Sequence, residues 1–110
     1  DRPASRRGGK PRRAVGAYVV LVDGFATLFV DRGGEHVLCF EDESTEAGAS
    51  RIEQGLRSLA RGVGRMGKGR IEVQDVDGEK ARGSALADAF TRAGFRAGYR
   101  GFEAEAPRDA

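Results

Sequence analysis

Three short apolar runs near the start of the chain are separated by turn-forming residues. Asp23-Gly24 stands between "GAYVVLV" and "FATLFV", and Arg32-Gly33-Gly34 stands between "FATLFV" and "EHVLCF". An Asp-Gly pair between β-branched and aromatic residues is a strong hairpin signal, because both central residues of a type I′ turn take positive φ. Glycines also supply the left-handed conformations that a reversal of three or four residues demands. The pattern predicts an antiparallel meander of three strands over residues 16–40.

The first two predicted strands are apolar on both faces. The alternating sets are Tyr18, Val20 and Val22 against Val19 and Leu21, then Phe25 and Phe29 against Leu28 and Val30. A sheet of this kind needs cover on both sides. Two amphipathic helices can cover one face. The other face then curls on itself, is met by helices split across the sheet, or docks on a neighbouring domain.

A helix follows the meander. Residues 41–50 are acidic and poor in large apolar side chains, so we expect a surface loop there. Ser50 and Glu53 have the spacing of a capping box, which starts a helix. Apolar residues then recur at spacings of four and three and share one helical face: Ile52, Leu56, Leu59, Val63 and Met66. Because Gly55, Gly62 and Gly64 weaken this helix, we expect its end to fray between residues 64 and 69.

The rest of the chain predicts a strand, a helix and a strand. Residues 70–76, "RIEVQDV", alternate apolar and polar positions, which is typical of a strand with one wet face. Ser84 is a suitable N-cap and Gly94 a suitable left-handed C-cap for a helix lined by Leu86, Phe90 and Ala93. Residues 102–106 alternate again. The predicted class is α+β, in the order β-β-β-α-β-α-β, with an antiparallel sheet that can curve into a barrel-like form.

Charge is distributed unevenly along the chain. Residues 1–13, "DRPASRRGGKPRR", hold six Lys or Arg against one acid, or +5, and residues 14–110 hold thirteen against sixteen, or −3. The first segment has almost nothing to bury, so we expect a disordered arm or an interdomain linker. As an arm it can contact phosphates through Arg6, Arg7, Lys10, Arg12 and Arg13. The chain therefore divides into this arm, one α+β module over residues 14–106, and a frayed end at 107–110.

The cysteine count and the absence of long apolar runs bear on the compartment. A lone cysteine, Cys39, excludes an internal disulfide and a cysteine-based zinc site, which fits a reducing environment. Nothing resembles a signal peptide or an apolar run of about twenty residues. We expect a cytoplasmic protein with no membrane partner. Because the chain opens at Asp1 without an initiator Met, we also expect a fragment of something longer.

Three motifs that suggest chemistry are better explained by structure. Residues 62–67, "GVGRMG", match the glycine fingerprint of dinucleotide sites, but they follow a helix, whereas that site needs a helix N-terminus. The two "VDG" stretches lack the alternating ligands of a calcium loop. His36 and Cys39 lie three residues apart in one predicted strand, and so on opposite faces, which argues against a Cys–His nucleophile. We predict no catalytic residue, metal site or cofactor within these residues.

Two sets of basic residues are the candidate nucleic-acid-binding residues. The first comprises Arg57, Arg61, Arg65 and Lys68, and the second comprises Arg92, Arg96 and Arg100. Their spacing lets each set follow a phosphate backbone. The alternative is a solvated face, since any soluble amphipathic helix has a charged outer side.

Three stretches carry a family resemblance: "GAYVVLVDGFATLFVDRGG", "GKGRIEVQDVDGE" and "SALADAFTRAGFRAGYRGF". Together they resemble the extreme C-terminal segment of the large helicase-related (Lhr) family, which are bacterial ATP-dependent superfamily 2 helicases. The resemblance covers about residues 14–103. It departs from the family pattern at Ala85 and Tyr99, where a proline is usual.

The resemblance implies a parent protein that hydrolyses ATP with Mg²⁺, moves 3′ to 5′ along single-stranded DNA, and unwinds duplexes or DNA–RNA hybrids in DNA repair. Its motor motifs lie upstream, so no ATPase role is carried onto these residues, and catalysis is expected of the parent rather than of this segment. The family's C-terminal region is similar to winged-helix DNA glycosylases and ends in a β-barrel-like module.

Three hypotheses follow from that resemblance. The chain is a non-catalytic accessory module that contacts DNA or docks on upstream domains, it completes a glycosylase-like base pocket with those domains, or it forms a homo-oligomer.

Overall fold

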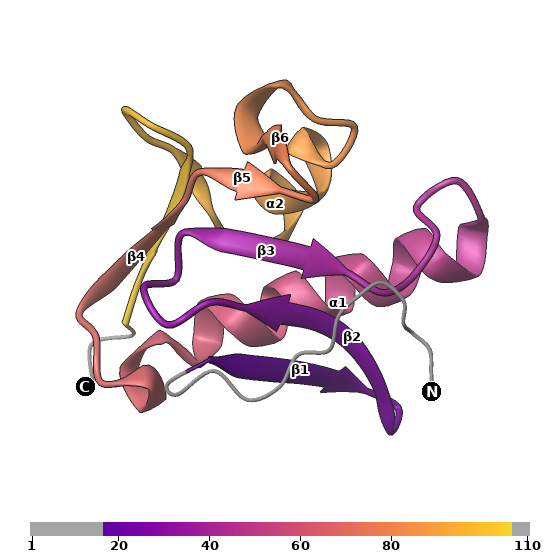
Figure 1. Cartoon of the computed structure of the whole chain (residues 1–110), viewed down its shortest axis with the longest axis horizontal. Coiled ribbons are helices and arrows are strands. Elements are labelled where there is room, and N and C mark those ends of the chain that lie inside the picture. The colour runs from indigo at the N-terminus through magenta and orange to yellow at the C-terminus, as the bar shows by residue number, and fades with distance from the viewer. Residues whose placement is uncertain (1–16, 107–110) are drawn as a thin grey trace.

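A three-stranded antiparallel meander lies across the front of the molecule (Figure 1). The computed structural model describes residues 17–106, and the meander consists of β1 (Tyr18–Val22), β2 (Phe25–Val30) and β3 (His36–Cys39). Asp23 and Gly24 have φ angles of 54° and 84°, as a type I′ turn requires. Gly34 has a φ of 75°, and a Cβ there would collide with the Ile71 side chain. The predicted meander is confirmed.

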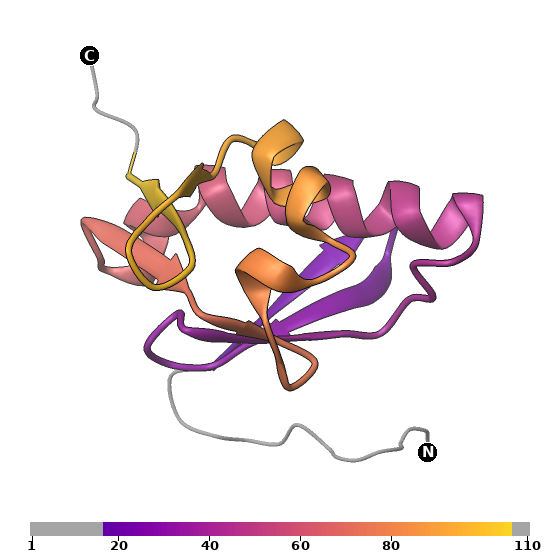
Figure 2. The same ribbon diagram turned by 90° about the horizontal axis from the view of Figure 1, so that it is seen from above.

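The long helix α1 (Glu46–Arg61) packs on the inner face of the meander (Figure 2). The predicted apolar stripe is confirmed, because Ile52, Leu56, Leu59 and Val63 are at most 3% exposed and Met66 packs against them. At Gly55, α1 packs closely against β2. A Cβ at this position would lie 3.3 Å from side-chain atoms of both Leu28 and Thr27.

The start of α1 corrects the sequence prediction. Thr45, not Ser50, is the N-cap, and its Oγ1 accepts a hydrogen bond from the Gly48 N–H at 2.9 Å. Gly48 permits this early start, because a Cβ there would collide with the Asp42 carbonyl. The predicted loop over residues 41–50 is therefore wrong in its second half, where the helix is already formed.

The end of α1 also differs from the prediction. After Gly62 the chain forms a 3₁₀ turn, η1 (Val63–Met66), which ends at Gly67 with a φ of 77°. The glycine-rich segment is thus a defined turn rather than a frayed helix end. It keeps Val63 fully buried on the same apolar stripe.

The single strand predicted over residues 70–76 is two strands in different sheets. β4 (Arg70–Val73) pairs antiparallel with β8 (Phe102–Glu105), whereas β5 (Asp75–Val76) pairs parallel with β3. The break falls at Gln74, whose N–H donates to the Glu35 carbonyl at 2.7 Å. At this contact with the turn between β2 and β3, the chain leaves the sheet that contains β4 and enters the sheet that contains β3.

The complete architecture has two open sheets, and both helices lie on the same side of the first sheet. The first sheet has the order β1-β2-β3-β5-β6 and the second β4-β8-β7, where β6 is Glu79–Lys80 and β7 is Arg96–Ala97. The α+β class is confirmed, with β3–β5 as a parallel pair in otherwise antiparallel sheets. The barrel-like form is wrong, because the strands do not close into a ring. Helices split across the first sheet are also excluded (Figure 2).

The second helix, α2 (Ala87–Ala93), follows a short 3₁₀ turn, η2 (Ala81–Gly83). It begins two residues later than a Ser84 cap implies. The Ser84 hydroxyl donates to the Ala81 carbonyl at 2.8 Å and so closes the preceding turn, and its Oγ also accepts from the Leu86 N–H at 3.2 Å, just before α2. The predicted end is confirmed. Gly94 has a φ of 108°, and the Phe95 N–H donates back to the Phe90 carbonyl at 3.0 Å.

Phe90 joins α2 to the second sheet. Its ring is fully buried, stacks on Phe102 of β8 with centroids 4.8 Å apart, and meets Phe95 edge-on at 5.1 Å. Within residues 17–106, no helix is long and apolar enough to cross a bilayer. The predicted basic arm and frayed C-terminus lie outside the described residues.

The aromatic cluster leads to a stability prediction. Phe90→Ala should lower the free energy of unfolding by roughly 3–5 kcal/mol, because it empties a fully buried site between two other rings. This is a large part of the 5–15 kcal/mol typical of a domain. Urea unfolding measures it, with Arg92→Ala on the exposed side of α2 as the control, which should cost no more than about 1 kcal/mol. Equal midpoints for the two variants would contradict the orientation of α2.

Candidate nucleic-acid interface

Glu53 on α1 engages two of the candidate arginines. Arg57 Nη2 donates to Glu53 Oε2 at 2.9 Å, and Arg92 Nε, from α2, donates to Oε1 at 2.8 Å. The hydrogen bond from Arg92 is the main cause that lowers the pKa of Glu53 below its ordinary value. The carboxylate is therefore charged at neutral pH and connects the two helices on their outer side. One arginine of each predicted basic set therefore shares this single carboxylate.

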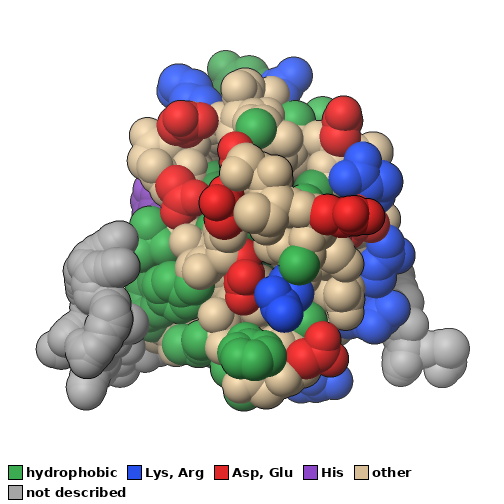
Figure 3. Space-filling model, turned by 90° about the vertical axis from the view of Figure 1, so that its right-hand side faces the viewer, with side chains coloured by type: hydrophobic (Ala, Val, Ile, Leu, Met, Phe, Trp, Pro, Cys, Tyr) green, Lys and Arg blue, Asp and Glu red, His purple; other side chains and the backbone are tan. Residues whose placement is uncertain are grey.

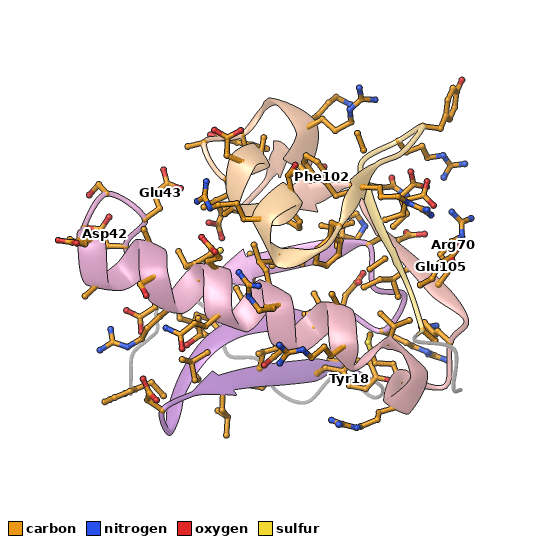
Figure 4. The ribbon with its side chains drawn as sticks, turned by 180° about the vertical axis from the view of Figure 1, so that it is seen from behind. Tyr18, Asp42, Glu43, Arg70, Phe102 and Glu105 are labelled. Atoms are coloured by element: carbon orange, nitrogen blue, oxygen red, sulfur yellow. The ribbon has the colours of Figure 1, made fainter. Side chains whose placement is uncertain are left out.

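The second sheet holds a further candidate, Arg96, against acidic side chains. Its Nη2 lies 3.7 Å from Glu103 Oε1 and 3.5 Å from Glu105 Oε2. Arg70 Nη1 donates to the same Glu103 oxygen at 2.8 Å, and this bond raises the pKa of Arg70. Arg70 and Glu105 lie together at the edge of this sheet (Figure 4). Arg96 is thus surrounded by carboxylates, which repel phosphate.

The remaining residues of the first set form a separate group at one end of α1. Arg61 lies in the last helical turn, Arg65 in η1, and Lys68 just after the left-handed Gly67. None of the three makes an ion pair with another residue of the described range 17–106. The C-terminus of a helix also favours cations, so Arg61 stabilises the helix end. We call Arg61, Arg65 and Lys68 the basic end.

Tyr18 connects the start of the described chain to the basic end. Its hydroxyl donates to the Met66 carbonyl of η1 at 3.2 Å, and Figure 4 shows Tyr18 beside this turn. Arg13, the last basic residue of the N-terminal segment, precedes Tyr18 by five residues, a reach of at most about 18 Å. The described part of the chain therefore begins beside the basic end.

Arg100, the last candidate, lies in the hairpin between β7 and β8. The Gly98 N–H donates to the Gly101 carbonyl at 2.6 Å, Arg82 Nη1 donates to the Gly98 carbonyl at 3.0 Å, and the Arg100 N–H donates to Glu72 Oε2 at 2.9 Å. A polar cleft of about 310 Å³ lies beside this hairpin, lined by Gly33, Glu35, Arg70, Ile71, Glu72, Gln74 and Arg100.

Tyr99 at the same hairpin was not among the predicted site residues. It is 92% exposed, which is the highest value among the large hydrophobic side chains of the described residues. The sequence contained a signal, because an aromatic residue stands in the glycine-flanked stretch "GYRG".

The outer face of the meander is apolar and exposed. Val19, Phe29 and Leu38 are directly paired neighbours on β1, β2 and β3, and Val19 and Leu38 are 49% and 48% exposed. Leu21 and Phe40 extend the row, at 59% and 45% exposure. Hydrophobic side chains gather on the left of Figure 3, the side toward which the meander faces outward. We call these five residues the outer apolar face.

His36 and Cys39 lie on opposite faces of β3, as predicted. His36 is exposed, with Nδ1 2.7 Å from Asp75 Oδ2, whereas Cys39 packs against the core. Burial raises the pKa of the Cys39 thiol, and the Asp77 carboxylate raises it further, so the sulfur stays protonated. No group of three His, Cys, Asp or Glu residues that could hold a metal occurs within residues 17–106. Residues 62–67 follow α1, at the end of the helix where carbonyls rather than amides are unpaired.

Comparison with known proteins adds no assignment. Neither a scan against protein-family models nor searches of curated proteins and of solved structures found a significant match.

Proposed function

We propose that this chain is a non-catalytic accessory module that contacts single-stranded nucleic acid within a DNA helicase similar to the large helicase-related family. The observation that carries the proposal is the Tyr18–Met66 hydrogen bond, which places the attachment of the basic N-terminal segment beside the basic end. In this role ATP and Mg²⁺ belong to the motor of the parent helicase. The chain itself supplies phosphate contacts.

The charge distribution supports contact at this end of the molecule. Residues 14–110 carry a net charge of −3, so the module as a whole does not attract a polyanion, and attraction depends on local positive groups. The basic end provides three cations without acidic partners among the described residues, and residues 1–13, which precede β1 in the sequence, carry a net charge of +5. Phosphate contact there displaces no ion pair of the described structure.

The other candidates fit phosphate contact less well. Arg57 and Arg92 share Glu53, and Arg96 lies near Glu103 and Glu105. A phosphate at any of these three positions competes with a carboxylate and lies within reach of its negative charge. We therefore assign the main contacts to the basic end and the N-terminal segment.

Two matched triple variants of the whole chain test this assignment against oligo(dT). Arg61→Gln, Arg65→Gln and Lys68→Gln should weaken binding and lower the slope of log affinity against log salt by about 2, because each lost phosphate contact on a single strand contributes about 0.7. The control triple, Arg57→Gln, Arg92→Gln and Arg96→Gln, removes the same charge and should change the slope little. Equal effects of the two triples would show that only net charge matters and would contradict the assignment.

Docking is a second candidate function, favoured by the outer apolar face. No described element covers it, since both helices lie on the other side of the first sheet (Figure 2). An exposed apolar row flanked by polar residues is typical of a protein interface. As the occupant we propose another folded domain of the same helicase, which presents an apolar surface of its own.

Binding in trans tests the docking candidate. The chain should sediment as a monomer and bind the parent helicase truncated before these residues, and Phe29→Glu with Leu38→Glu should abolish that binding. Thr91→Glu, an exposed change on α2, should leave it intact. A dimer of the isolated chain that the Phe29 and Leu38 changes dissociate would instead identify a second copy as the occupant, and no binding in trans would reject docking.

A further inference from the structure

We infer that the tip of the β7–β8 hairpin, residues 98–101, is a stacking site for an unpaired nucleobase, with the Tyr99 ring as the platform and Arg100 as the neighbouring phosphate contact. This inference rests on the proposed function, because it extends the path of the same single strand. It concerns a contact of a different kind, stacking rather than charge.

The hairpin is held rigid from three directions. Within the tip, the Gly98 N–H bonds to the Gly101 carbonyl at 2.6 Å. From the η2 side, Arg82 donates to the Gly98 carbonyl at 3.0 Å, and from β4, Glu72 accepts from the Arg100 N–H at 2.9 Å. These bonds fix the backbone on both sides of Tyr99.

Close packing requires glycine at position 101, where the obstacle is the backbone of β4, and it is also tight at Gly98, where the obstacles are the ends of two carboxylate side chains. A Cβ at Gly101 would collide with the Val73 carbonyl, and a Cβ at Gly98 would lie 2.6 Å from carboxylate oxygens of Glu72 and Glu103. The hairpin therefore lies tightly against β4 and β8. The side chain it presents is free of these contacts, because Tyr99 is 92% exposed.

An aromatic ring that is 92% exposed on a fixed backbone is well placed for recognition. An aromatic side chain on a fixed backbone loses little conformational entropy when it binds, because only two side-chain torsions remain. Every nucleobase offers a flat π-face, and proteins that bind single strands combine such stacking rings with a basic track. The Tyr99–Arg100 pair provides both elements on adjacent residues.

The position of the hairpin relative to the basic end fits one continuous strand. Lys68 leads directly into β4, which begins at Arg70 and ends at Val73, where Gly101 packs. The rise along β4 is about 10 Å, a distance that a few nucleotides can span. Glu72 and Glu103 lie between the two sites, and Arg70 pairs with Glu103 and offsets its charge. The strand makes its contacts on either side of this stretch.

Oligo(dT) carrying one 2-aminopurine, added to the whole chain, tests the inference. Stacking on Tyr99 should change the fluorescence of the probe, and Tyr99→Ala should remove that change and weaken binding by roughly 10-fold, as the loss of one stacked aromatic does. The slope of log affinity against log salt should stay as in the unmodified chain, because no phosphate contact is lost. Tyr99→Phe should retain the signal and the affinity, whereas Tyr99→Leu should lose both.

The outcomes of this experiment distinguish failure of the proposed function from failure of the stacking site. If the unmodified chain does not bind the probe even at low salt, the proposed function and the stacking site both fail. If the chain binds and Tyr99→Ala leaves the affinity and fluorescence unchanged, only the stacking site is overturned. If Tyr99→Leu behaves like the unmodified chain, the ring acts as a general apolar contact, as it would for a protein partner, and base stacking is rejected.

Discussion

The close approach of α1 to the inner face of the meander at Gly55 is the constraint on which the rest of the structure depends. A Cβ at this position would lie 3.3 Å from side-chain atoms of Leu28 and Thr27, so a larger residue requires these side chains to shift if the helix keeps its observed distance from β2. Ile52 and Leu56, on either side, are then fully buried. Glycine weakens an isolated helix by about 1 kcal/mol relative to alanine, and here the contact between layers offsets that cost.

Two features of the surface follow from this packing. Since α1 covers the inner face and α2 lies on the same side, the outer apolar face has no cover among the described residues. The length of α1 along the meander also brings η1 to the start of β1, where Tyr18 bonds to the Met66 carbonyl. The exposed apolar surface and the position of the start of β1 beside the basic end are therefore both consequences of the position of one helix.

Carboxylates separate the basic residues into two groups. Glu53 and Glu103 hold arginines from elements far apart in the sequence, and these pairs connect α1 to α2 and β4 to β8. Exposed pairs of this kind add about 0–1 kcal/mol each to stability, so their main consequence is electrostatic. The arginines that they hold are less available to phosphates, whereas the basic end has no acidic partner among the described residues.

Features that depend on local chemistry could be predicted from the sequence, and features that depend on distant partners could not. The Asp23-Gly24 turn, the apolar stripe of α1 and the Gly94 cap were all predicted, because each is encoded by residues within one or two turns. The break at Gln74 could not be predicted, since its cause is a bond to Glu35, nearly forty positions earlier.

The start of α1 and the division of the arginines show the same limit. Ser50 matches a capping pattern as well as Thr45 does. Thr45 is the cap in the structure because Gly48, which has no Cβ, can pack against the Asp42 carbonyl in the first helical turn. Arg92 and Arg65 are indistinguishable as members of basic sets until Glu53 is placed beside one of them. Tyr99 was noted only as a departure from a family pattern, because its exposure depends on how the hairpin packs.

The most direct test of the account is a map of backbone amide chemical shifts of the whole chain during titration with a short oligo(dT). The account predicts that the largest changes fall in two segments, residues 61–68 and residues 98–101, with smaller changes along β4 between them. Changes centred instead on the outer side of α1 around Glu53 and Arg57, or on the outer apolar face, with none at residues 61–68, would contradict it.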